Sequence, residues 1–99
     1  MKDTENYVKI YKNCGRTLMF LRDEGSISFV KEDYCQGGSS YHEVIVPEEA
    51  LVNAVNIPTS SEMTLTGKME LLFGCYDGME HFVQFCDEAG IETMTLFWD

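Results

Sequence analysis

The sequence CYDGMEHFVQFCDEAGIETMTLFWD, residues 75–99, carries the clearest pattern in this chain of 99 residues. Asp77 is suited to cap the start of a helix, because its carboxylate can accept from unpaired backbone N–H groups, and Glu80 follows three residues later. Gly90 is suited to the left-handed conformation that ends many helices. These signals predict a helix over 78–89.

At about 100° per residue, this helix has one apolar side and one polar side. The apolar side comprises Met79, Phe82, Val83, Phe85, Cys86 and Ala89. The polar side comprises Glu80, His81, Gln84, Asp87 and Glu88. A helix of about 12 residues does not stay folded alone in water, so its apolar side requires a sheet to pack on.

The rest of the chain contains several candidate strands for that sheet. After Gly90 the spacing changes to two, with Met94, Leu96 and Trp98 alternating with Thr93, Thr95 and Phe97. This predicts a closing strand. Near the start of the chain, similar alternation predicts strands over 6–12, 16–22 and 27–31. Short turns over 13–15 and 23–26 would join them into an antiparallel meander.

The middle of the chain is harder to interpret. Residues 32–40 show no periodicity and predict a flexible loop, followed by a strand over 41–46. Pro47 with Glu48 and Glu49 predicts the start of a short helix that ends before Pro58. Residues 62–73 predict strand structure, either as a hairpin or as one long strand with a bulge.

The sequence therefore predicts a single α+β domain over 1–99. We expect an antiparallel sheet of about five strands, beginning with a meander and ending with a C-terminal strand. One short helix and one longer amphipathic helix would pack on one face of this sheet.

Charge is the most unusual property of the composition. The formal net charge is −10, from 17 acidic and 7 basic residues. Residues 1–31 carry a net charge of about +2 and residues 32–99 about −12, since Lys68 is the only base after Lys31. Nucleic acids and anionic membranes would be repelled by most of such a surface, so we expect a basic protein as partner.

No signature of a catalytic, metal or cofactor site is recognisable. The four cysteines form no Cys-x-x-Cys pair, which favours free thiols over a zinc site or a disulfide framework. Cys75 and His81 could pair as nucleophile and base, but their spacing across a helix start does not fix their geometry. No apolar run approaches the length of a membrane span and no secretion signal is visible, so we expect a cytoplasmic, non-enzymatic protein without cofactors.

The acidic residues are the favoured candidates for function. The candidate partner-binding residues are Asp77, Glu80, Asp87, Glu88, Glu48 and Glu49. Carboxylates on a rigid surface can stand in for phosphates and occupy the basic groove of a nuclease or another nucleic-acid-processing enzyme. Anti-CRISPR, anti-restriction and immunity proteins inhibit enzymes in this way, which is an analogy of size and charge alone.

The alternative hypothesis is a protein-binding module that acts through apolar residues or the edge of a strand. Tyrosine and tryptophan are enriched at interfaces, and an uncovered edge strand can pair with another chain, including a second copy in a homodimer. Salt distinguishes the two hypotheses, because screening weakens a charge-led complex and leaves an apolar one largely unchanged.

Overall fold

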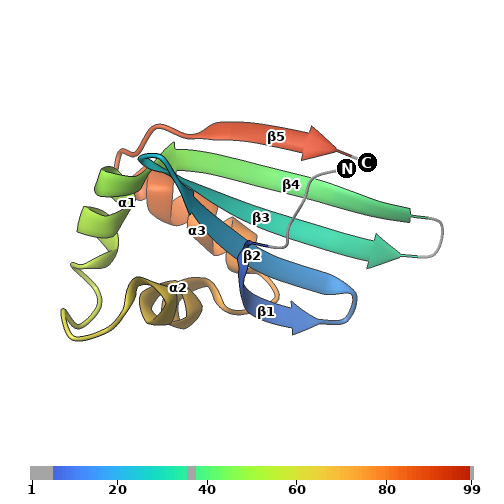
Figure 1. Ribbon diagram of the computed structural model, residues 1–99, viewed down its shortest axis with the longest axis horizontal. Helices are drawn as coiled ribbons and strands as arrows, with labels where there is room; N and C mark the ends of the chain where they lie inside the picture. Colours follow the sequence, from blue (N-terminus) through green and yellow to red (C-terminus); the bar gives the residue numbers. More distant parts are fainter. Residues whose placement is uncertain (1–5, 36–37, 99) are drawn as a thin grey trace.

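The structure is a computed structural model that describes residues 6–35 and 38–98 (Figure 1). The elements in chain order are β1 (Val8–Asn13), β2 (Arg16–Asp23), β3 (Ser26–Cys35), β4 (Gly38–Pro47), α1 (Glu48–Val55), α2 (Leu65–Phe73), α3 (Gly78–Glu88) and β5 (Met94–Trp98). Among these described residues, no helix has the length and apolar character needed to cross a membrane.

The strands form one antiparallel sheet in the order β1-β2-β3-β4-β5. The first four strands follow one another as a meander, and the chain then makes all three helices before β5 returns to pair with β4. The helices lie over one face of the sheet, as Figure 1 shows. The predicted α+β class, the five antiparallel strands and the C-terminal strand are confirmed, although the chain forms a third helix that the sequence pattern did not predict.

Two tight turns set the register of the meander. Cys14 and Gly15 have φ values of 53° and 77°, and Glu24 and Gly25 have 45° and 87°. Positive φ at both central residues is what a type I′ turn requires, and this turn matches the twist of antiparallel strands. Both predicted turns are therefore confirmed.

The main core lies between the sheet and the helices. Alternate residues of β2, β3 and β4, among them Phe29, meet Phe73 of α2 and Phe82 of α3. The ring of Phe82 stacks on Phe29 with centroids 4.4 Å apart, and Phe73 meets both rings edge-on. All three rings are almost completely buried. The predicted packing of an amphipathic helix on one sheet face is thus confirmed.

A second, smaller cluster lies on the opposite face of the sheet. It contains Tyr7, Met19, Val30 and Tyr41, with Leu21 partly buried beside them. Alternation over 6–12 sets Val8 and Ile10 against Tyr7, Lys9 and Tyr11, and so predicts that Tyr7 lies on the outer face of a half-buried strand. This prediction is wrong, because the face of the sheet away from the helices also has a buried centre, which includes Tyr7. A bulge in β1 shifts the register between Lys9 and Tyr11, which places both Ile10 and Tyr11 against the main core.

The strand prediction for 62–73 is wrong. Leu65–Phe73 form α2, whose N-cap Thr64 accepts a 3.1 Å hydrogen bond from the backbone N–H of Gly67. Met69 and Phe73 are buried four residues apart, as a helix requires. The Lys68 ammonium donates to the Asn56 side chain, so α2 is also tied to the end of α1. Helical spacing and the Thr64 cap outweigh the β-propensity of the threonines.

The predicted loop over 32–40 is mostly strand. β3 continues to Cys35 and β4 begins at Gly38, with Tyr34 opposite Ser39 and Glu32 opposite Tyr41. Residues 36 and 37 lie outside the described part of the chain. In Figure 1 this hairpin extends beyond the helices, so it needs no hydrophobic alternation and left no periodic signal in the sequence.

The positions at which α3 begins and ends agree with the sequence pattern, but the predicted capping hydrogen bond of Asp77 is not formed. The helix begins at Gly78 as predicted, yet the Asp77 side chain makes no capping hydrogen bond. At the other end Gly90 has a φ of 71°, and the Ile91 N–H donates to the Cys86 carbonyl at 2.9 Å. This bond, with that from Gly90 to Asp87, forms a Schellman motif.

Candidate partner-binding surface

α3 is held rigidly because one side of it is fixed in the core. Met79, Phe82 and Cys86 are almost completely buried, at spacings of three and four residues. The predicted apolar side is narrower than expected, since Val83 is 41% exposed and Ala89 is exposed as well. The remaining surface of α3 is therefore presented to solvent on a fixed frame.

A groove runs between α3 and the sheet on the side of β5, with a volume of about 560 Å³. We call it the α3 groove. It is lined by Met79, Glu80, Val83, Gln84, Asp87, Ile91, Thr93, Lys31 and His42. The first five come from α3, Lys31 and His42 come from paired positions of β3 and β4, and the others precede β5. One wall is acidic, because Glu80 and Asp87 are exposed and lie two helical turns apart.

His42 lies at the base of the α3 groove. Its ring stacks on Phe97 of β5, with centroids 4.3 Å apart. Burial, and secondarily the charge of Lys31, lower the pKa of His42 below 6.5. A neutral imidazole near pH 7 leaves Lys31 as the one positive group among the residues that line the groove.

The structure does not bring the six predicted residues into one site. Glu80 and Asp87 share the α3 groove. Glu88 lies in a different depression beside His81, and Gln84 donates to it at 3.3 Å. Asp77 lies at the start of α3, where its charge acts on Arg16. All four carboxylates are exposed and belong to α3 or its N-cap, but they do not lie in one line, because Glu80 and Asp87 border the α3 groove and Glu88 borders the depression beside His81.

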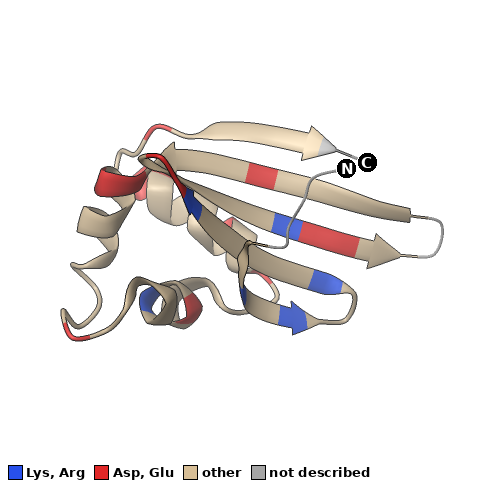
Figure 2. Cartoon of the chain, viewed as in Figure 1, with Lys and Arg blue, Asp and Glu red and all other residues tan. Residues whose placement is uncertain are grey.

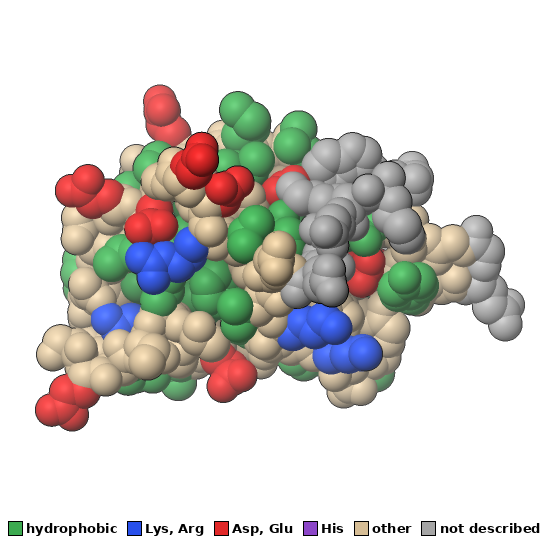
Figure 3. Space-filling model, in the orientation of Figure 1, with side chains coloured by type: hydrophobic (Ala, Val, Ile, Leu, Met, Phe, Trp, Pro, Cys, Tyr) green, Lys and Arg blue, Asp and Glu red, His purple; other side chains and the backbone are tan. Residues whose placement is uncertain are grey.

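Glu48 and Glu49 belong to a separate acidic region at the start of α1. The Glu48 N–H donates to the Gly25 carbonyl at 2.8 Å, which places the β2–β3 turn and its acidic residues next to α1. At this end of the molecule Figure 2 shows red segments of the ribbon, and Figure 3 shows red side chains. Glu48 is paired with Arg22 at 3.0 Å and this hydrogen bond lowers its pKa, whereas Glu49 is exposed.

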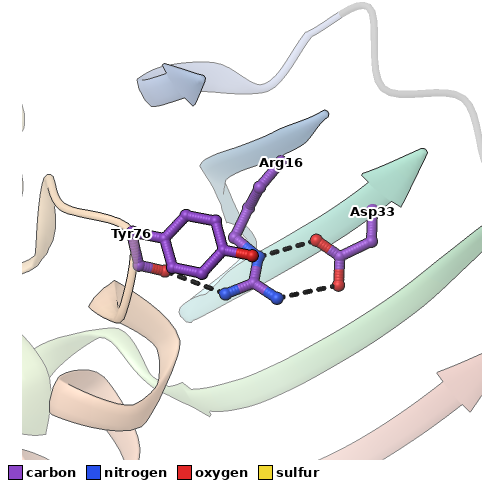
Figure 4. A network of polar contacts seen from close by, with 3 residues as sticks. All are labelled: Arg16, Asp33 and Tyr76. Carbon is purple, nitrogen blue, oxygen red and sulfur yellow. Dashed lines mark hydrogen bonds and ion pairs between the residues drawn. The ribbon is translucent and has the colours of Figure 1, made fainter. Parts of the chain in front are cut away.

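An arginine network fixes the segment that leads into α3 (Figure 4). Arg16 of β2 donates to both carboxylate oxygens of Asp33 in β3, at 2.7 and 3.2 Å, and to the Tyr76 carbonyl at 3.0 Å. Its guanidinium also lies 4.0 Å from the centroid of the Tyr76 ring. The Asp33 hydrogen bond raises the pKa of Arg16. This network positions the start of α3, and no local sequence pattern indicates it because its members are 17 and 60 residues apart.

Basic residues collect elsewhere. Lys9 and Lys12 of β1 line a depression with Thr17 and Glu32, on the side of the sheet away from the helices. Blue side chains gather at the corresponding corner of the face in Figure 3. The molecule is therefore electrically asymmetric, with carboxylates on α3 and α1 and lysines along the β1 edge.

Cys75 and His81 do not share a depression. His81 lines its depression with Leu72, Gln84 and Glu88, and Cys75 is not among the residues of that depression. Across residues 6–35 and 38–98, no three His, Cys, Asp or Glu side chains are grouped so that they could hold a metal ion. The four cysteines are free thiols, and burial raises the pKa of Cys86 to about 11.

Comparison of the chain with protein-family models, with curated proteins and with solved structures found no match.

Proposed function

We propose that this chain is a non-enzymatic protein-interaction protein that inhibits a nucleic-acid-processing enzyme by occupying its basic surface. The observation that carries the proposal is the set of exposed carboxylates on α3 and its N-cap, Asp77, Glu80, Asp87 and Glu88, of which Glu80 and Asp87 border the α3 groove. The ion pairs found among the described residues involve Asp33 and Glu48, so these four acidic groups remain available to a partner.

The spacing along α3 suits a surface that normally binds phosphates. Glu80 and Asp87 are seven residues apart, which corresponds to about 10 Å along a helix. Successive phosphates of one DNA strand advance by about 3.4 Å along the duplex axis, so the two carboxylates span about three nucleotide steps. Because Phe82 and Cys86 hold the helix in the core, the backbone that carries the carboxylates is already ordered before binding, which leaves only the side-chain entropy to be lost.

The charge of the whole chain supports the same reading. A net charge of −10 would steer a basic partner toward the molecule and accelerate the encounter at low salt. It would also disfavour nucleic acid itself as the ligand. The partner is therefore expected to be a protein whose Lys and Arg side chains line a groove for DNA or RNA.

The test is affinity capture from a lysate of the cells that produce the protein, with washes at about 50 and 500 mM salt. The wild type should retain one basic nucleic-acid enzyme at low salt and release it at high salt. A variant with Glu80→Lys and Asp87→Lys should not retain it. The matched control carries Glu62→Lys and Glu70→Lys, which make the same change in net charge at exposed positions outside α3.

The control separates a local acidic surface from net charge. Equal loss of the enzyme in both variants would show that overall charge alone attracts it. Undiminished capture by the Glu80→Lys, Asp87→Lys variant would refute the role of α3. Far-UV circular dichroism on both variants verifies that the fold is intact.

A further inference from the structure

The two outer strands of the sheet differ in how they are protected. β1 is protected as natural edges usually are, since Lys9 and Lys12 lie on it, a bulge interrupts it and α2 contacts it. Within residues 6–35 and 38–98, β5 pairs with β4 alone, and its sequence MTLFW contains no charged residue and no proline. Figure 1 shows β5 along the border of the sheet, away from α1 and α2. No strand of the described chain covers the outer edge of β5, so this edge is available to another strand.

Exposed apolar side chains flank this open edge on both faces. Met94 is 61% exposed and Leu96 is 36% exposed on the face away from the helices. Phe97 is 73% exposed on the helix side, where Val83 of α3 is also exposed across the α3 groove. Backbone groups and apolar surface are thus available together, which is the combination that favours pairing of an edge strand.

We propose that β5 pairs with β5 of a second copy, antiparallel and about a two-fold axis. An antiparallel pairing centred on Leu96 is self-complementary, and it places Thr95 of each copy beside Phe97 of the other on the helix side of the sheet. The two five-stranded sheets become one continuous sheet, with the helices of both copies on the same face. The occupant is a second copy because the pairing is self-complementary and β5 carries no charge, so two chains of net charge −10 can meet along this edge without setting like charges of β5 against each other.

The available area indicates a concentration-dependent dimer. An aromatic side chain offers about 150–250 Å² to an interface, so the exposed part of Phe97 contributes roughly 150 Å² per copy. Met94 and Leu96 add to this area, together with the backbone of a five-residue strand. The total from both copies approaches the lower limit of about 1,000 Å² for a specific interface. Monomer and dimer should therefore exchange.

Salt should strengthen this dimer. Pairing places the acidic α3 surfaces of both copies on one face of the joined sheet, and each copy carries a net charge of −10. Screening reduces this repulsion, while the apolar and backbone contacts of β5 are little affected. Salt should strengthen the β5 dimer and weaken the complex with the basic enzyme of the proposed function. The dimer and the inhibitor proposals can therefore fail independently.

Sedimentation equilibrium over a range of protein concentrations tests the proposal. The wild type should form a dimer whose dissociation constant falls as salt is added. In a Met94→Lys, Phe97→Lys variant the dissociation constant should be at least about tenfold higher, because lysines on an edge oppose pairing. The matched control carries Ile57→Lys and Leu71→Lys, which are 86% and 64% exposed and lie outside β5. The control should dimerise like the wild type.

Three results would overturn the proposal. The first is a wild-type protein that stays monomeric up to about 1 mM. The second is a dimer whose dissociation constant is the same in the β5 variant. The third is a wild type that forms no dimer but binds a different protein through β5, which the β5 variant then fails to bind. Hydrogen exchange of the unmodified chain provides a test that needs no variant. Amide protons of β5 should become more protected as the concentration rises while those of β1 should not, and equal behaviour of the two edges would contradict the pairing.

Discussion

Replacement of Phe82 by alanine tests whether α3 is held to the sheet as the structure indicates. The Phe82 side chain is fully buried, stacks on Phe29 at 4.4 Å and meets Phe73 at 5.2 Å. Truncation of a buried phenylalanine typically costs about 3–5 kcal/mol, because the transfer free energy is lost and a cavity remains. A domain of this size has a free energy of unfolding of about 5–15 kcal/mol, so the loss is a large fraction.

Phe97→Ala is the matched control, because it removes the same side chain from a position that is 73% exposed. About a quarter of its surface is buried, or about 50 Å², which corresponds to a loss of about 1 kcal/mol at 25 cal/mol per Å². With a urea m-value of about 1–1.5 kcal/mol/M, the midpoint of unfolding should fall by about 3 M for Phe82→Ala and by about 1 M for Phe97→Ala. Similar shifts for both variants would refute the assignment of Phe82 to the core.

Three further results follow from single residues. Iodoacetamide should label three cysteines in the native protein and Cys86 only after unfolding, because Cys86 is buried and its pKa is raised to about 11. Mass spectrometry counts the labelled thiols, and four labels on the native protein would contradict this expectation. The free energy of unfolding should fall as the pH is lowered from about 7.5 to 5.5, because His42 takes up its proton near pH 6.5 in the unfolded chain and only at lower pH in the folded protein. The variant His42→Gln should show a smaller dependence of the free energy of unfolding on pH, measured by urea titration. An unchanged dependence would be inconsistent with a lowered pKa. Gly15→Ala should lower the free energy of unfolding by about 1–2 kcal/mol more than Gly25→Ala does, measured by urea unfolding. Both glycines have a positive φ, but only at Gly15 would the new methyl group lie 2.7 Å from the Tyr34 carbonyl oxygen. Equal losses would argue against this close approach.

The parts of the fold that the sequence predicted are those whose signals are local. The ends of α3 are marked by residues within one turn of each boundary, and the meander turns by glycines at their second central positions. The helix α2 was predicted as strand because threonines favour strands locally, whereas Met69 and Phe73 reveal their helical spacing only against a known core. The polar end of the β3–β4 hairpin had no periodicity because no helix covers it.

The sequence predicts which acidic residues are exposed on the candidate surface, but not how they are arranged in space. The polar side of α3 follows from helical periodicity, and the structure presents it to solvent as expected. The division of the acidic residues between α3 and the start of α1 depends on tertiary packing. Lys31 and His42 were missed as groove residues because the register of β3 and β4 places them beneath α3, and the flexible loop predicted for 32–40 obscured that register.

The most direct test of the proposed inhibitor is a displacement assay on the enzyme recovered by capture. A fluorescent oligonucleotide is bound to that enzyme, and its polarisation is followed as this chain is added. If the α3 carboxylates stand in for phosphates, the wild type should release the oligonucleotide, and the Glu80→Lys, Asp87→Lys variant should need at least about tenfold more protein to do so. A stable ternary complex, or equal displacement by the variant, would contradict the proposal that α3 occupies the nucleic-acid site.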